Sequence, residues 1–352
     1  MSPAPPRPHP SRFLAFRRMA ADYFGLVIAL AALVAVFGFS TNNFFSTTTL
    51  YTIANQIPAA LLLATAMTYV LIIAEIDLSV GSVLGFCSAV LGVAMVQWKW
   101  PLWAALGATC GTGVLCGTFS GLVSMRWRLP SFIVTLGVLE MARGGAHAVT
   151  KSQTQYIGSP IEGLAGTTVL DVVGWMAGGT AAVERVLPGA WLLKISLAFL
   201  FALSVLILAQ LVLSRTVFGR YVVAVGTNEE AVRLSGIDPR PIKLAVFVLT
   251  GLLVACAAAI DTSRFQSANP NAGSGYELQA IAAAVIGGTS LMGGRGGVVS
   301  SLFGVLIIAV LNAGLAAIGA RDETKRLVTG AVIVAAVIVD QYRQRFARGK
   351  TN

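Results

Sequence analysis

Long apolar runs separated by short polar stretches make up most of this chain. A membrane-spanning helix needs about 20 mainly apolar residues. The runs that approach this length are residues 22–39, 52–74, 80–97, 102–124, 131–149, 192–213, 243–261, 278–291, 297–318 and 327–340. The eighth and tenth runs are short, which is typical of tilted, broken or partly re-entrant helices. The pattern predicts an all-α polytopic membrane protein with about ten transmembrane helices.

The most polar internal stretch, residues 214–243, lies between the sixth and seventh runs. Its cations are Arg215, Arg220, Arg233, Arg240 and Lys243. Because Lys and Arg concentrate in cytoplasmic loops, we expect this stretch to lie in the cytoplasm. The same rule places both termini there, with residues 1–21 a disordered basic tail, 22–342 the membrane domain and 343–352 a second basic tail. Residues 150–191 then form a long periplasmic loop.

The polar stretch also contains the signals of a short helix. Thr227 followed by Glu230 fits a capping box, Gly236 suits a helix end, and Pro239 prevents continuation. A short helix on the cytoplasmic face could dock a soluble partner. A surface helix without a partner would show the same pattern, so the pattern alone does not decide between them.

Two turns rich in small and polar residues interrupt the apolar runs. Their polar and glycine positions are Glu75, Asp77, Ser79 and Gly81 in the first turn, and Gly293, Gly294 and Arg295 in the second. We expect each turn to join two spans at the cytoplasmic end and to lead into a helix of small residues. These matching positions predict a parallel internal duplication, in which residues 50–149 and 243–340 are two copies running in the same direction.

Acidic residues are rare within the runs. An acid deep in a bilayer is expensive and usually functional. Asp77 at a span end has a simpler interpretation, because it can accept hydrogen bonds from free backbone N–H groups of the next helix. Glu140 has Arg143 as its i,i+3 partner. This scarcity of acids argues against a proton-coupled carrier.

Uncharged polar side chains within the runs are candidates for a transport pathway. They are Asn55, Gln56, Thr65, Thr68, Thr135, Gln279 and Asn312. Sparse amide and hydroxyl groups suit a sugar, although for any one of them ordinary hydrogen bonding between helices is the better explanation. Gly113, Gly117 and Gly121 form a small-residue face that predicts tight helix packing.

Composition excludes several classes of function. The chain is 56% hydrophobic and 11% charged, whereas a soluble domain averages roughly 25% charged. Its net charge of +10 is spread between apolar runs, which indicates a lipid bilayer around the chain and no nucleic-acid partner. The four cysteines form no Cys-x-x-Cys pair and there are only two histidines, so we expect no metal site and no catalytic site. The sequence also lacks a nucleotide-binding motif.

Four segments resemble a known family. They are AEIDLSVGSVLGF at 74–86, LPSFIVTLGVLEMARG at 129–144, TVFGRYVVAVGTNEEAVRLSGI at 216–237 and AIAAAVIGGTSLMGGRGGVVSSLFGVLI at 280–307. Together they resemble the permease subunits of bacterial ABC importers for monosaccharides, in the ribose, xylose, galactose and arabinose branch. The Ala-Glu pair at 74–75 is most similar to the xylose-type permeases.

The resemblance implies a homodimer around one pathway in the bacterial inner membrane. It also implies a cytoplasmic ABC ATPase, which would bind the ATP and Mg, and a periplasmic sugar-binding protein. The chain itself would hold no cofactor and would perform no covalent chemistry. The segment similar to the family's ATPase-coupling helix contains Thr227, Asn228, Glu229, Glu230, Arg233 and Gly236, and Arg295 with its glycines resembles a second contact or hinge. A stand-alone secondary transporter and a membrane enzyme are the alternatives.

Overall fold

The computed structural model describes residues 12–41, 44–158, 161, 196–321, 323–332, 334–335 and 338. Within them the helices are α1 (Arg12–Ser40), α2 (Thr47–Ile72), α3 (Val80–Val96), α4 (Leu102–Trp127), α5 (Ser131–Thr150), α9 (Leu197–Arg215), α10 (Val217–Thr227), α11 (Glu229–Leu234), α12 (Arg240–Phe265), α13 (Tyr276–Ile286) and α14 (Val298–Ala317). Two short strands, β1 (Gln155–Tyr156) and β2 (Ser267–Ala268), pair antiparallel.

The helices follow the apolar runs. Among the described residues, six helices are long and apolar enough to cross a membrane, and α3 and α13 are shorter apolar helices. The helix α1 begins at Arg12, so the expected disordered tail is helical from that residue onward. Most of the expected outer loop at 150–191, and the tail at 343–352, lie outside the described residues.

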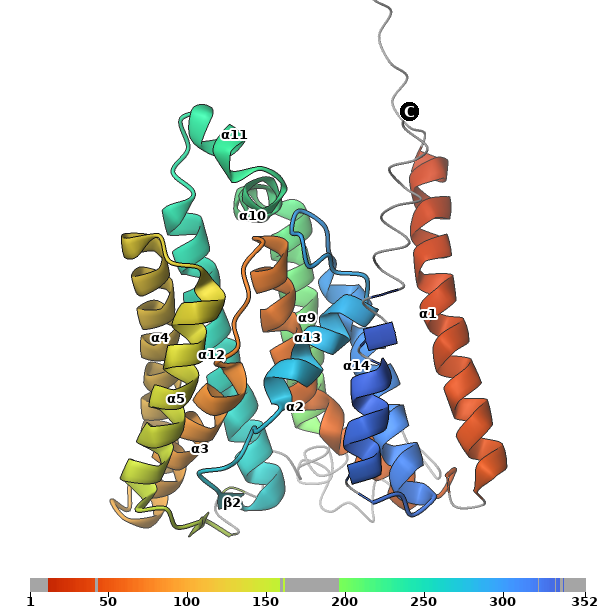
Figure 1. Ribbon diagram of the computed structural model, residues 1–352. Helices are drawn as coiled ribbons and strands as arrows, with labels where there is room; N and C mark the ends of the chain where they lie inside the picture. The colour runs from red at the N-terminus through yellow and green to blue at the C-terminus, as the bar shows by residue number, and fades with distance from the viewer. Residues whose placement is uncertain are drawn as a thin grey trace, which may run out of the picture.

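The helices α10 and α11 lie at one end of the bundle, which we call the α11 end (Figure 1). The polar stretch therefore folds as two short helices, where the sequence predicted one. The long helices α2, α4 and α9 run toward the α11 end, and α1, α5, α12 and α14 run away from it (Figure 1). The paired strands β1 and β2 lie at the opposite end.

Two of the apolar helices cross only part of the bundle. Residues 73–79 leave the α11 end as extended backbone before α3 begins, and residues 266–275 rise from the opposite end before α13 begins (Figure 1). The two helix starts adjoin, because a Cβ added at Gly81 would contact the Glu277 carboxylate and the Gly273 carbonyl. Interrupted backbone at membrane depth is tolerated where protein surrounds it. The eighth run is therefore a broken helix, as its length indicated.

The predicted parallel duplication is wrong. Glu75 at the end of α2 pairs with Lys243 at the start of α12, while the Asn55 carbonyl accepts a hydrogen bond from Arg264 at the other end. These contacts make α2 and α12 antiparallel. In the first unit, the non-helical residues 73–79 lead into α3, and in the second unit residues 266–275 lead into α13. The two arrangements correspond but run in opposite directions, so the two units are inverted. The loop at 287–297 lies at the α11 end, as residue 75 does. It follows the half-helix α13, however, whereas residues 73–79 precede the half-helix α3.

Glycines bring α4 and α12 into close contact. A Cβ at Gly113 would meet the Gly251 carbonyl, and a Cβ at Gly117 would meet the Phe247 carbonyl. Further along, a Cβ at Gly121 would lie 2.9 Å from Leu244 Cδ1. The predicted small-residue face is thus confirmed, and it packs along α12.

Two further contacts complete the bundle. The ring of Phe37 in α1 lies against Gly314 in α14, where a Cβ would clash with it. Phe37 also stacks on Phe44 with ring centroids 5.9 Å apart. These aromatic side chains fix α1 on the outer side of α14, away from α4 and α5 (Figure 1).

Candidate functional site: an exposed helix pair and an internal cavity

The helix α11 begins at Asn228. Its side-chain Oδ1 accepts a hydrogen bond from the Ala231 N–H at 3.0 Å. Thr227, expected as the capping residue, is the last residue of α10, and its hydroxyl donates to the Val223 carbonyl at 2.7 Å. The predicted capping box is therefore wrong: Asn228 takes the extended conformation that the cap requires, and the third residue of the helix is Ala231, which has no side-chain acceptor to complete a box. Gly236 follows the helix with φ +85°, as a helix-ending glycine does.

The outer face of α11 carries an exposed ion pair. Glu230 and Arg233 are 2.7 Å apart, and their side chains are 59% and 60% exposed. An ion pair in water contributes roughly 0–1 kcal/mol to stability, so the Glu230–Arg233 pair adds little to the stability of α11. Both side chains are free to meet another protein.

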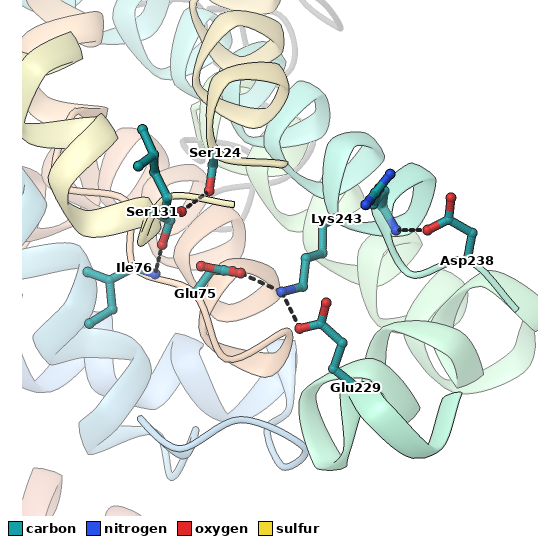
Figure 2. Close-up of polar contacts among 9 residues, drawn as sticks. Glu75, Ile76, Ser124, Ser131, Glu229, Asp238 and Lys243 are labelled. Atoms are coloured by element: carbon teal, nitrogen blue, oxygen red, sulfur yellow. Dashed lines mark hydrogen bonds and ion pairs between the residues drawn. The ribbon is translucent and has the colours of Figure 1, made fainter. Parts of the chain in front are cut away.

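The inner face of α11 contacts the bundle through Lys243. The Lys243 ammonium donates to Glu75 Oε1 at 2.6 Å and to Glu229 Oε2 at 2.7 Å. Figure 2 shows this bridge, with Glu75 on the segment after α2, Glu229 on α11 and Lys243 on α12. Lys243 and Glu75 are only 12% and 16% exposed, whereas Glu229 is 51% exposed.

A groove of about 700 Å³ lies beside this bridge. The end of α4, the residues that lead into α5, the end of α11 and the first residues of α12 form its walls. Its polar lining residues are Glu75, Ser124, Arg128, Glu229, Arg233, Asp238, Arg240 and Lys243. The groove places charges of both signs next to the exposed face of α11.

The glycine loop at 287–297 packs on the other side of α10. The Gly294 N–H donates to the Ile72 carbonyl at 2.9 Å. Gly293 and Gly294 both have positive φ, and a Cβ at Gly293 would lie 2.6 Å from the Gly226 carbonyl. The exposed Arg295 and neighbouring residues surround a small pocket of about 190 Å³. The end of α2, the end of α10 and this loop are therefore in backbone contact.

The extended residues 73–79 are held by α5. The Ile76 N–H donates to Ser131 Oγ at 3.0 Å, and the Leu78 N–H donates to Thr135 Oγ1 at 3.1 Å. Asp77 is buried and accepts from the Ser79 N–H and hydroxyl, at 2.8 and 2.6 Å. Asp77 thus satisfies backbone next to α3, as expected, and Thr135 is a support for this segment.

The other extended segment is also held by α5. Arg143 Nη1 donates to the carbonyls of Pro270 and Ala272 at 2.7 and 2.9 Å. Among the described residues Arg143 forms no ion pair with Glu140 within 4.0 Å, contrary to the prediction. The reason is that residues 269–272 offer free carbonyls that a broken helix leaves without partners. A single helix therefore holds both interruptions.

An internal cavity of about 290 Å³ lies between α2, α12, α13 and α14. Three predicted pathway residues, Gln56, Gln279 and Asn312, line it. Asn55 and Thr135 do not line it, and Thr68 bonds to Ser301 Oγ across the α2–α14 contact at 2.6 Å. The cavity volume is close to the lower end of the roughly 300–1,000 Å³ range typical of small-molecule sites.

The cavity also contains side chains that the sequence analysis missed. Asp261 and Arg264 of α12 are 4.0 Å apart, and Tyr276 begins α13. The Asp261 side chain is 5% exposed. An acid inside an apolar run was the available signal, because such residues usually face a cavity or a partner.

The fold and these sites define a polytopic helical membrane protein of the transport class, with broken helices, a cavity that contains several polar side chains and a protruding helix pair. Residues 49–337 match the family described as "Branched-chain amino acid transport system / permease component". The chain belongs to this permease family. Its members are components of transport systems and not enzymes in themselves.

Curated relatives cover nearly the whole chain. The ribose import permease protein RbsC of Escherichia coli (strain K12) is 37% identical over 318 residues, covering 90% of this chain and 93% of the relative. The xylose transport system permease protein XylH of the same strain is 33% identical over 373 residues, covering 95% of each. RbsC of Haemophilus influenzae is also 37% identical, over 316 residues. No solved structure matches the chain.

Proposed function

We propose that this chain is the membrane permease of an ATP-driven ABC importer for a monosaccharide, with a pentose such as ribose or xylose the favoured cargo. The observation that carries the proposal is the similarity to ribose and xylose permeases over at least 90% of the chain. The family description names branched-chain amino acids, so an amino acid is the cargo that a test must exclude.

The distribution of cations supports a cytoplasmic α11 end. Cations on the helix ends and loops at this end are Arg126, Arg128, Arg215, Arg220, Arg233, Arg240, Lys243 and Arg295. The opposite end carries fewer, namely Lys99, Lys151, Arg264, Arg321, Lys325 and Arg326. An excess of Lys and Arg marks the cytoplasmic side. In this orientation the protein lies in the bacterial inner membrane with its N terminus in the cytoplasm.

The α11 end is the proposed docking surface for an ABC ATPase. The exposed Glu230–Arg233 pair and the loop with Arg295 present charges at one membrane face. A second copy of the chain would complete the pathway, and a periplasmic sugar-binding protein would deliver cargo at the opposite end. ATP and Mg would bind to the ATPase.

The cavity is the proposed part of the pathway within this chain. Gln56, Gln279 and Asn312 supply amide donors and acceptors that suit sugar hydroxyls, and Tyr276 supplies an aromatic face. ATP-driven closure of the ATPase would move α11, and the helices would rock so that the pathway opens to each side in turn.

Reconstitution tests the proposal. The chain would be purified with the ATPase and binding protein encoded beside it, placed in liposomes, and assayed for ATP hydrolysis and uptake across pentoses, hexoses and leucine. Stimulation by one sugar supports the importer and names the cargo, and stimulation by leucine overturns the sugar assignment. We expect Glu230→Ala/Arg233→Ala to insert normally and lose uptake. Full uptake by this variant would remove the docking role.

A stand-alone secondary transporter is the second candidate. Inverted repeats with broken helices are frequent in secondary transporters, and the acid Asp261 lines the cavity. This candidate predicts uptake by the permease alone, driven by an ion gradient and abolished by an ionophore. Uptake that requires ATP and persists with the ionophore excludes it.

A further inference from the structure

Three elements that are distant in sequence meet at the Lys243 side chain. Glu229 belongs to α11, Glu75 belongs to the extended segment 73–79, and Lys243 belongs to the first turn of α12 (Figure 2). Within the part of the chain that the structure describes, neither carboxylate forms another ion pair. One ammonium group therefore holds two carboxylates from two separate elements.

The two halves of this bridge differ in exposure. Lys243 and Glu75 are 12% and 16% exposed, so breaking this half would leave a nearly buried charge without a partner. Glu229 is 51% exposed and forms the outer half, within reach of a protein bound to α11. The bridge is thus anchored inside the bundle and accessible at its outer end.

The inner anchor leads directly to the broken helices. Glu75 is followed by Ile76 and Leu78, whose backbone N–H groups are held by α5. The same segment continues into α3, whose start adjoins the start of α13 at Glu277. A displacement of Glu75 therefore acts on the point where the two half-helices meet.

Lys243 also has a second route to the interior. It lies on α12, and the far part of this helix places Asp261 and Arg264 in the cavity. A movement of α11 can therefore reach the cavity through the helix that carries Lys243 and through the segment that carries Glu75. By contrast, the ion pair between Glu230 and Arg233 joins two residues of α11 to each other.

We infer that Lys243 is the positioning residue that transmits movement of α11 to the broken helices, by linking Glu229 to Glu75. This inference rests on the proposed function, since it assigns the coupling step of the same importer. Removing the link should leave ATPase docking and hydrolysis in place and should separate hydrolysis from uptake.

The test uses the reconstituted complex of permease, ATPase and binding protein. The variants are Lys243→Met, which removes the bridge, Lys243→Arg, which keeps its charge, and Glu75→Gln/Lys243→Met, which removes the bridge without leaving Glu75 charged. Arg126→Met is the matched control, because Arg126 is an exposed cation in the last turn of α4 at the same end. For each variant, co-purification with the ATPase, ATP hydrolysis and sugar uptake are measured, and uptake per ATP is compared.

We expect both variants that lack the bridge to retain the ATPase and to lose at least tenfold in uptake per ATP. Lys243→Arg and Arg126→Met should remain within twofold of the natural protein. If Lys243→Met does not fold, the double variant supplies the result. Unchanged uptake per ATP in the double variant overturns the inference and leaves the importer intact.

Two other outcomes are also decisive. Loss of the ATPase from both variants that lack the bridge would show that Lys243 maintains docking, which overturns the transmission role. Absence of any complex or ATP-dependent uptake with the natural protein would overturn the proposed function, and the inference with it.

Discussion

The contact between α4 and α12 provides a quantitative test of the fold through Gly117→Ala. A Cβ at Gly117 would lie 3.0 Å from the Phe247 carbonyl carbon and closer to its oxygen, whereas ordinary contacts begin at 3.4 Å. Both neighbours are backbone atoms, so the two helices must separate by about 1 Å, which removes up to about half of each dispersion contact. These helices form the most extensive helix pair of the described residues.

The net effect follows from two opposing terms. Overpacking costs about 1–3 kcal/mol, and the gain in helix propensity from Gly to Ala returns about 0.5–1 kcal/mol. We therefore expect a loss of about 1–2 kcal/mol. At about 2.1 cal/mol/K of unfolding entropy per residue, 352 residues correspond to roughly 1.4 °C per kcal/mol, so the thermal midpoint should fall by about 1–3 °C.

The assay is thermal unfolding of the purified protein in detergent, followed by tryptophan fluorescence. Gly111→Ala is the matched control, because a Cβ at Gly111 on the same helix meets nothing within 4 Å. Its midpoint should stay level or rise. Equal midpoints for the two variants, or a rise for Gly117→Ala, would refute the close approach of α4 and α12.

Three further predictions concern the sites. Asn228→Ala removes the cap of α11, which costs about 0.5–2 kcal/mol, so binding of the ATPase should weaken severalfold. Thr227→Ala, the control, should bind normally. Weaker binding by Thr227→Ala than by Asn228→Ala would instead support Thr227 as the capping residue. Arg143→Met removes two charge-assisted hydrogen bonds of about 1.5–3 kcal/mol each, and a midpoint equal to that of the natural protein would contradict the clamp. Asn312→Leu should lower the sugar response without affecting ATPase binding, and an unchanged uptake curve would exclude Asn312 from the pathway.

The sequence predicted the helical membrane class and most helix positions, because hydrophobic runs report burial in lipid directly. It also predicted the short helix in the polar stretch, the close packing at Gly117 and three residues that line the cavity. Each of these depends on local composition or on spacing along one helix. The resemblance to sugar permeases, which rested on four continuous segments, agrees with the family comparison.

The direction of the two units could not be read in the same way. Residues 73–79 contain Glu75, Asp77 and Ser79 and so look like a turn between spans, and hydropathy does not distinguish a complete crossing from half of one. The prediction matched the turn after residue 75 with the loop at 287–297, because both lie at one membrane face, whereas the segment that corresponds to 73–79 is 266–275 at the opposite end. The contacts of Arg143 with Pro270 and of Lys243 with Glu75 were missed for a related reason, since each joins residues more than 100 positions apart in the sequence. The contact of Lys243 with Glu229 is local by comparison.

The inverted units have a consequence for the direction of transport. A bundle built from α2–α4 and the reversed α12–α14 presents similar architecture to both membrane faces, and so has little intrinsic preference for inward or outward movement. Among the described residues, the faces differ most at α10 and α11. If the proposed importer is correct, vectorial movement would be a property of its attachments: the ATPase proposed to bind at α11 would supply the polarity, and the membrane bundle alone would be close to a reversible conduit.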